Sequence, residues 1–91
     1  MMKEIRYSRQ FKKDFKRYRH DMRKVTLLAD ILKFLSDGIE LPSKYKAHTL
    51  IGEYAGCMEC HIGSDYLLIW RDEVNDVIYL ERLGSHSELF D

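Results

Sequence analysis

The chain has 91 residues, of which 45% are hydrophobic and 12% aromatic, and its 15 basic and 15 acidic side chains cancel. A chain of this length folds as one domain, residues 1–91, and its apolar content excludes an intrinsically disordered protein. No apolar run approaches the roughly 20 residues of a membrane-spanning helix, and no signal-peptide core follows Met1. We therefore expect a cytoplasmic protein with no membrane partner.

The balanced net charge hides a division along the chain. Residues 1–46 hold 13 Lys or Arg against 6 Asp or Glu, whereas residues 47–91 hold 2 against 9. This division predicts a basic surface for a nucleic acid, built from the first half. The alternative is that two solvated faces of opposite charge attract each other across the fold.

The N-terminal half predicts a strand and two helices. Residues 3–7 alternate in polarity, as in a half-exposed strand. Ser8 is a suitable N-cap for a basic helix, whose apolar stripe begins at Phe11 and Phe15. Asp21 and Gly38 are suitable caps for a second helix, in which apolar residues repeat at spacings of three and four.

Helical periodicity is lost over residues 37–50, which we interpret as a basic loop, and strand-like segments follow. These cover residues 53–62, 66–72 and 77–84. The second is apolar on both faces, which predicts a place in the centre of the sheet. The order β-α-α-β-β-β describes a single α+β domain, with a helical hairpin packed on one side of a mainly antiparallel sheet.

The segment Cys57-Met58-Glu59-Cys60-His61 matches c-type haem attachment and offers soft metal ligands. Haem attachment needs export, and two cysteines three residues apart on a strand point to opposite faces. We therefore expect no metal here. The same alternation predicts that His61 projects with Cys57 and Glu59 from one face of the strand. It assigns four side chains to the core face: Tyr54, Met58, Cys60 and Ile62.

Three histidines, His48, His61 and His86, lie at the ends of predicted elements, where a scaffold presents reactive groups. RNA is cut without a metal when its 2′-OH attacks the adjacent phosphate, and this reaction needs a base, an acid and a cation. The histidines supply the first two, and Arg82 supplies the third. Singly, each histidine has the alternative of a solvated loop residue, and Arg82 that of an ion pair with a nearby acidic residue, Glu81 or Asp72.

Further site candidates flank this set. Phe90 near the C-terminus is suited to stacking on an RNA base, with a hydrophobic plug as the alternative. Asp65 and Tyr66 begin the central strand beside His61, and Tyr66 is equally suited to the core.

Four segments together resemble the YafQ branch of the RelE/ParE toxin superfamily: residues 45–52, 60–62, 65–70 and 82–90. The last segment reads R-L-G-S-H-S-E-L-F and matches the pattern R-x-G-[ST]-H-x-x-L-F. The resemblance covers essentially the whole chain and implies a RelE-like fold. In that family, acid–base chemistry, phosphate stabilisation and base stacking fall to residues that match six positions: His48, His61, Asp65, Arg82, His86 and Phe90. Relatives place Trp or an aliphatic residue at the position of Tyr66.

The resemblance implies a ribosome-dependent mRNA endoribonuclease of a type II toxin–antitoxin system, which works without a metal or other cofactor. A cognate antitoxin would hold it inactive, and DNA would be bound only through that antitoxin. Ribosomal RNA would contact the basic side chains of the first half: Lys12, Lys13, Lys16, Arg17, Arg19 and Lys46. The first rival is a ParE-like toxin of the same fold, which inhibits DNA gyrase without catalysis. The second is a metal-binding module built from Cys57, Cys60, His61 and His86.

Overall fold

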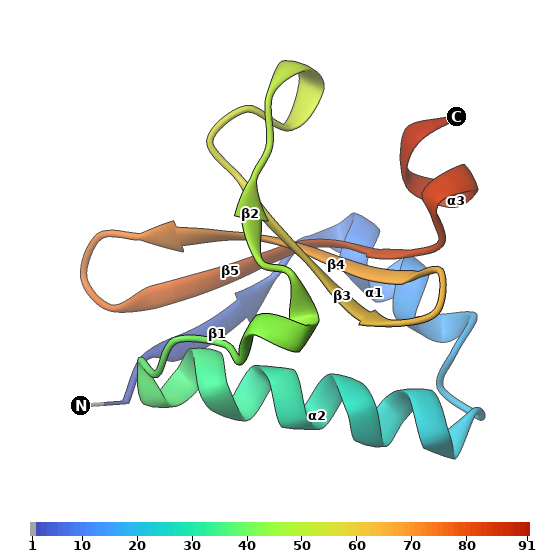
Figure 1. The fold of residues 1–91 in the computed structure, drawn as a ribbon, viewed down its shortest axis with the longest axis horizontal. Helices are drawn as coiled ribbons and strands as arrows, with labels where there is room; N and C mark the ends of the chain where they lie inside the picture. Colours follow the sequence, from blue (N-terminus) through green and yellow to red (C-terminus); the bar gives the residue numbers. More distant parts are fainter. Residues whose placement is uncertain (1) are drawn as a thin grey trace.

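A five-stranded sheet in the order β1-β5-β4-β3-β2 forms the centre of the computed structural model, which describes residues 2–91 (Figure 1). The strands and α-helices are, in chain order, β1 (Glu4–Tyr7), α1 (Arg9–Lys16), α2 (Met22–Asp37), β2 (His48–Thr49), β3 (Met58–Gly63), β4 (Tyr66–Glu73), β5 (Val77–Gly84) and α3 (His86–Phe90). Only the β1–β5 pair is parallel. The predicted α+β class, helical hairpin and mainly antiparallel sheet are thus confirmed, with β4 in the centre.

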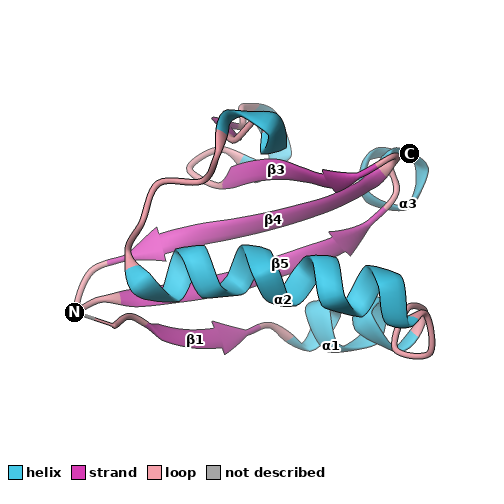
Figure 2. Cartoon of the chain, turned by 60° about the horizontal axis from the view of Figure 1, so that its bottom comes forward, coloured by secondary structure: helices cyan, strands magenta, loops and turns pink. Residues whose placement is uncertain are grey.

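The two long helices form one layer beneath the sheet (Figure 2). Ile31 of α2, Leu68 of β4 and Leu83 of β5 are fully buried in the core between these layers. All three predicted caps are confirmed. Ser8 Oγ accepts from Phe11 N at 2.9 Å, Asp21 Oδ1 accepts from Lys24 N at 3.1 Å, and Gly38 adopts the left-handed conformation with φ 69°. No helix within residues 2–91 is long and apolar enough to cross a membrane.

The opposite face of the sheet carries a second, smaller apolar cluster. Its buried members are Cys57, Leu67, Ile69 and Leu89, and Leu50 and Tyr54 pack against them. Leu89 belongs to α3, the short C-terminal helix, which therefore docks on the side of the sheet that the long helices leave free. On this second face of the sheet, polar side chains surround the second cluster.

The prediction was wrong in three places. The segment 37–50 is not simply a loop, because it contains a 3-10 helix (Ser43–Tyr45) and the edge strand β2. The strand predicted for residues 53–62 begins only at Met58, since left-handed glycines at 52 and 56, with φ 76° and 90°, flank a 3-10 helix (Gly52–Tyr54). Tyr54 consequently joins the second cluster and not the core face. The helix α3 was not predicted at all.

A β-bulge in β5 decides which of its side chains face the second cluster. Ile69 pairs with Arg82, but the next residue, Trp70, pairs with Leu80, so that Glu81 is an extra residue. Because of this shift, Leu80 and Leu83 both reach the main core, although they are an odd number of positions apart and would face opposite sides of a regular strand. Arg82 accordingly shares the face of Ile69.

Candidate active site

The three predicted histidines meet on the second face of the sheet. The ring centroids of His48 and His61 are 6.2 Å apart, and those of His61 and His86 are 5.8 Å apart. Strand pairing explains this row, since His48 pairs with Glu59 and His61 pairs with Leu67, a member of the second cluster. α3 then places His86 beside them. The structure thus brings together rings that lie up to 38 residues apart in the sequence.

A buried carboxylate, which the sequence analysis gave no role, lies between two of these rings. Glu59 is only 4% exposed, and its Oε1 is 3.2 Å from His48 Nε2 and 3.8 Å from His61 Nε2. Its Oε2 is buried without a hydrogen-bond partner within residues 2–91. The only available signal was the shared strand face of Glu59 and His61. A carboxylate in this position interacts electrostatically with both rings and can take part in proton transfer.

His86 is held at its backbone and at its ring by a single carboxylate. Asp65 Oδ1 accepts from His86 N at 2.9 Å and lies 3.0 Å from His86 Nδ1. These two hydrogen bonds lower the pKa of Asp65 from its ordinary value. An ionised carboxylate only accepts hydrogen bonds, so Nδ1 carries the ring proton and Nε2 is the nitrogen that remains for a substrate.

The partner of Arg82 is Asp14 of α1, and not Glu81 or Asp72 as the alternative reading had it. Arg82 Nε donates to Asp14 Oδ2 at 2.8 Å, and the same oxygen accepts from Leu83 N at 3.0 Å. Asp14 is fully buried. Its hydrogen bond to Arg82 is the main cause that raises the pKa of the guanidinium. Arg82 Nη1 also donates to the hydroxyl of Tyr54 at 2.9 Å, and the Tyr54 ring contacts Phe90, which in turn contacts His86.

Phe90 lies where its ring can meet a nucleotide. It is 44% exposed, and its ring contacts Tyr54 edge-on at 5.8 Å between centroids and His86 at 6.2 Å. The neighbouring Leu89, 4% exposed, belongs to the second cluster instead. The side chain that fills the interior as a hydrophobic plug, the alternative role given for Phe90, is therefore that of Leu89.

Tyr66 was a wrong assignment as an RNA contact. It is 1% exposed in the core beneath the sheet, where its ring packs on Tyr18 at 5.0 Å, and burial raises its pKa to about 12. Of the basic side chains, Lys46 lies near the histidine row, because it lines a hollow together with His61. Five of them lie exposed on or just after α1, and the sixth lies beside β2: Lys12, Lys13, Lys16, Arg17, Arg19 and Lys46.

The cysteines do not form a metal site. Cys57 and Cys60 are free and buried in separate clusters on opposite faces of the sheet, as predicted, and burial raises the pKa of Cys60 to about 12. Across residues 2–91, no three His, Cys, Asp or Glu side chains are arranged to hold a metal ion.

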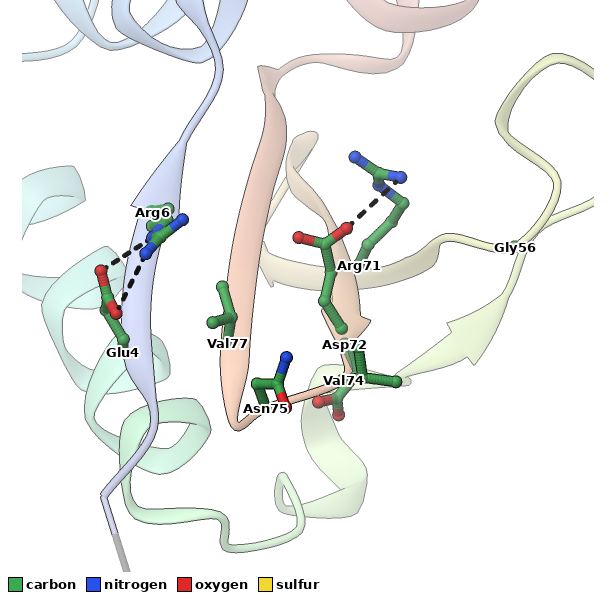
Figure 3. A pocket seen from close by; sticks show the side chains of 9 residues that line it. Glu4, Arg6, Gly56, Arg71, Asp72, Val74, Asn75 and Val77 are labelled. Carbon is green, nitrogen blue, oxygen red and sulfur yellow. Dashed lines mark hydrogen bonds and ion pairs between the residues drawn. The ribbon is translucent and has the colours of Figure 1, made fainter.

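A separate hollow lies at the far end of the sheet, by the start of β5, and holds none of the predicted site residues (Figure 3). It is lined mainly by charged side chains already paired with each other. Glu4 accepts from Arg6 at 2.7 Å, and Arg71 lies 3.7 Å from Glu73. The histidine row therefore remains the candidate site.

Comparison with known proteins shows the family of the chain. The family model "Bacterial toxin of type II toxin-antitoxin system, YafQ" matches residues 3–91. The mRNA interferase toxin YafQ of Escherichia coli strain K12 is 34% identical over 99% of this chain and 98% of its own length.

Solved structures show the same fold. YafQ in the E. coli DinJ–YafQ toxin–antitoxin complex has a TM-score of 0.85 at 29% identity, with all of both chains covered. A metal-bound toxin from Helicobacter pylori has a TM-score of 0.87 at 37% identity, with 98% of this chain and all of that chain covered. The predicted fold and family are thus confirmed: the chain belongs to the YafQ family of toxins of bacterial type II toxin–antitoxin systems.

Proposed function

We propose that this protein is an mRNA interferase that cuts mRNA on the ribosome without a metal ion, by attack of the 2′-OH on the adjacent phosphate. The observation that carries the proposal is the row of three imidazole rings, 6.2 and 5.8 Å apart between centroids, with Arg82 connected to it through Tyr54 and Phe90. A gyrase inhibitor of the ParE type would need no such row. The E. coli relative is itself named an mRNA interferase toxin.

The reaction transfers two protons and displaces one oxygen. A base removes the proton from the 2′-OH, whose oxygen forms a bond to phosphorus. The bond from phosphorus to the 5′ oxygen breaks, and an acid protonates that oxygen as it leaves. The products are a 2′,3′-cyclic phosphate and a 5′-hydroxyl end. Each proton-transfer group contributes about 10²–10⁴ in rate.

His86 and His61 supply the ring nitrogens closest to where such a substrate would lie. His86 presents Nε2 because Asp65 occupies Nδ1. His61 faces His86 from β3, with Glu59 3.8 Å behind its Nε2. His48 contacts the Lys46 carbonyl oxygen through Nδ1 at 2.7 Å and lies 3.2 Å from Glu59 through Nε2. It therefore orders Glu59 and extends the row of imidazole rings.

Charge on the phosphate is stabilised by Arg82, whose planar guanidinium is held by Asp14 and Tyr54 before substrate arrives. A cation that is already in place where negative charge develops stabilises the transition state strongly. Phe90, exposed and adjacent to His86, stacks on a base next to the scissile bond. Such stacking contributes about 1–3 kcal/mol.

A cognate antitoxin completes the proposal. The E. coli relative has been solved in complex with the antitoxin DinJ. We expect an antitoxin to bind this chain in the same manner, to neutralise part of its basic surface and to supply any DNA contact of the pair.

Primer extension on a translated message tests the proposal, with and without ribosomes and with wild-type protein or His86→Ala. We expect new 5′ ends only with ribosomes and wild-type protein, and growth arrest only with wild-type protein. Ser87→Ala, on the same short helix, is the matched control and should cleave normally. Full cleavage by His86→Ala would refute the assignment of the site, and cleavage of naked RNA at the wild-type rate would refute dependence on the ribosome.

A further inference from the structure

The helix α3 carries His86 and Phe90 but is too short to hold its own position. It has five residues, and isolated helices shorter than about 12 residues are marginal in water. Leu89 anchors it on the second cluster, and Asp65 holds its first residue. These two contacts fix one side of the helix. Its other side faces the end of α1, where Glu88 is the residue that makes contact.

Glu88 joins α3 to the turn after α1. Its Oε1 accepts from Ser85 N at 2.9 Å, which completes a capping box with the bond from Glu88 N to Ser85 Oγ at 3.1 Å. The same Oε1 accepts a hydrogen bond from the Tyr18 hydroxyl, and Oε2 lies 3.4 Å from Arg17 Nη1. Glu88 thus serves α3 twice, as its cap and as its link to the rest of the protein.

The surroundings of Glu88 are built to fit this carboxylate. A Cβ atom at Gly84 would lie 2.7 Å from Glu88 Oε1, so only glycine leaves the space that the carboxylate fills. Hydrogen bonds from Tyr18 and Ser85 lower the pKa of Glu88. Arg17 also lies 3.5 Å from Asp14, the residue that holds Arg82. Arg17 therefore links the contacts that hold α3 to those that hold the guanidinium of Arg82.

We infer that Glu88, held by Tyr18 and Arg17, is a positioning residue that keeps α3 docked so that His86 and Phe90 face the site. The inference rests on the proposed function for its effect on cleavage, but docking itself can be measured without RNA. Glu88 acts through His86 and Phe90, which lie two positions before and two positions after it in α3, and it does not touch the substrate.

Tyr18→Phe tests the link most cleanly, because it removes one hydroxyl and leaves both the capping box and the ring that packs on Tyr66. Amide hydrogen exchange is measured by NMR in the free protein. We expect exchange at Leu89 N and Asp91 N, which bond to Ser85 O and Ser87 O, to become about 5-fold faster, the effect of one lost hydrogen bond. Amides of the central strand should not change. Tyr79→Phe, on β5 beside Arg71, is the matched control.

Two substitutions at Glu88 separate its hydrogen bonds from its charge. Glu88→Gln keeps a side-chain oxygen for Tyr18 and Ser85 and should retain most of the protection of α3, whereas Glu88→Ala should lose it. Equal protection in wild type, Tyr18→Phe and Glu88→Ala would overturn the inference. Equal loss in Glu88→Gln and Glu88→Ala would overturn the role of the Tyr18 hydrogen bond.

A double-mutant cycle then connects docking with catalysis. Tyr18→Phe should lower kcat/KM several-fold in an otherwise wild-type protein and have a clearly smaller effect on the residual rate of His86→Ala, because the part of its effect that passes through His86 is absent there and only the part through Phe90 remains. The same fold-loss in both backgrounds would show general destabilisation and overturn the positioning role. A wild-type protein that cleaves no RNA would refute the proposed function and leave the exchange result standing.

Discussion

Asp14 holds Arg82 from 68 residues away, with 2.8 Å between Asp14 Oδ2 and Arg82 Nε. The carboxylate also accepts from Leu83 N, a group on the edge of β5 beyond its four-residue pairing with β1. One fully buried side chain thus completes the sheet edge and fixes the cation of the site. Under the proposed function, the pair contributes both to stability and to catalysis.

Replacing Asp14 should therefore reduce both the stability of the fold and the rate of cleavage. In Asp14→Ala, Arg82 is left partly buried without its counter-charge and Leu83 N without an acceptor. We expect a loss of about 3 kcal/mol in the free energy of unfolding, measured by urea denaturation, and slower cleavage. Asp30→Ala, at an exposed position of α2, should leave both unchanged. A stability loss no larger than that of the control would contradict this account.

The catalytic role proposed for His86 predicts that its replacement lowers the cleavage rate and leaves the fold intact. His86→Ala should reduce transcript cleavage by about 10²–10⁴. Its thermal melting should stay close to that of wild type, since the ring is exposed. Quantitative primer extension and circular dichroism measure the two effects. A variant that is inactive because it is unfolded would leave the catalytic role without support.

The basic helix α1 predicts salt-dependent association with the ribosome. Lys12→Glu combined with Lys16→Glu should weaken binding and reduce the slope of log K against log salt by about 1.5 or more, as expected for two lost phosphate contacts. Sedimentation with ribosomes at several salt concentrations gives this slope. Lys33→Glu, on α2, controls for net charge. Identical slopes for the double variant and wild type would rule out this surface.

Metal removal should have no effect on cleavage, because the proposed reaction takes its acid, base and cation from side chains. Dialysis against a chelator, followed by addition of zinc, is therefore expected to leave the cleavage rate and the melting temperature unchanged. The metal-bound H. pylori relative makes this test worthwhile. Loss of activity on chelation and its return with zinc would favour the metal-module reading instead.

Acid should weaken the fold through Asp65. Its pKa is lowered by hydrogen bonds from His86, so its contribution to stability is present above the ordinary carboxylate pKa of about 4 and is lost as pH falls through the lowered value. Asp65→Asn keeps the left-handed turn, with φ 48° in wild type, but not this dependence. The stability difference between wild type and Asp65→Asn should shrink from pH 6 to pH 3. A constant difference would contradict the pairing.

Patterns local in sequence predicted much of this molecule. The caps at Ser8, Asp21 and Gly38 and the doubly apolar β4 were found correctly, because each depends on residues a few positions apart. The histidine row was predicted from element ends and from the C-terminal motif. The two-residue β2 was missed, since a strand so short carries no period.

The helix α3 has a sequence signal that the prediction overlooked, whereas the pairing of Asp14 with Arg82 has none. Ser85 and Glu88 show the S-x-x-E spacing of a capping box, which marks the start of α3. Asp14 stands among lysines on a basic helix, and nothing near it in the sequence indicates a partner 68 residues later. Long-range pairs of this kind depend on how α1 leaves β1, which only the assembled fold determines.

The extra residue in β5 has a consequence for how this toxin can change. Glu81 has no place in the ladder with β4, yet its presence turns Arg82 toward the histidines and Leu83 toward the helices. If Glu81 instead paired with β4 as an ordinary residue of the ladder, the two would exchange: the guanidinium would face the apolar core and Leu83 would face the second cluster. The register of β5 is therefore as important to the candidate site as the side chains that the strand carries.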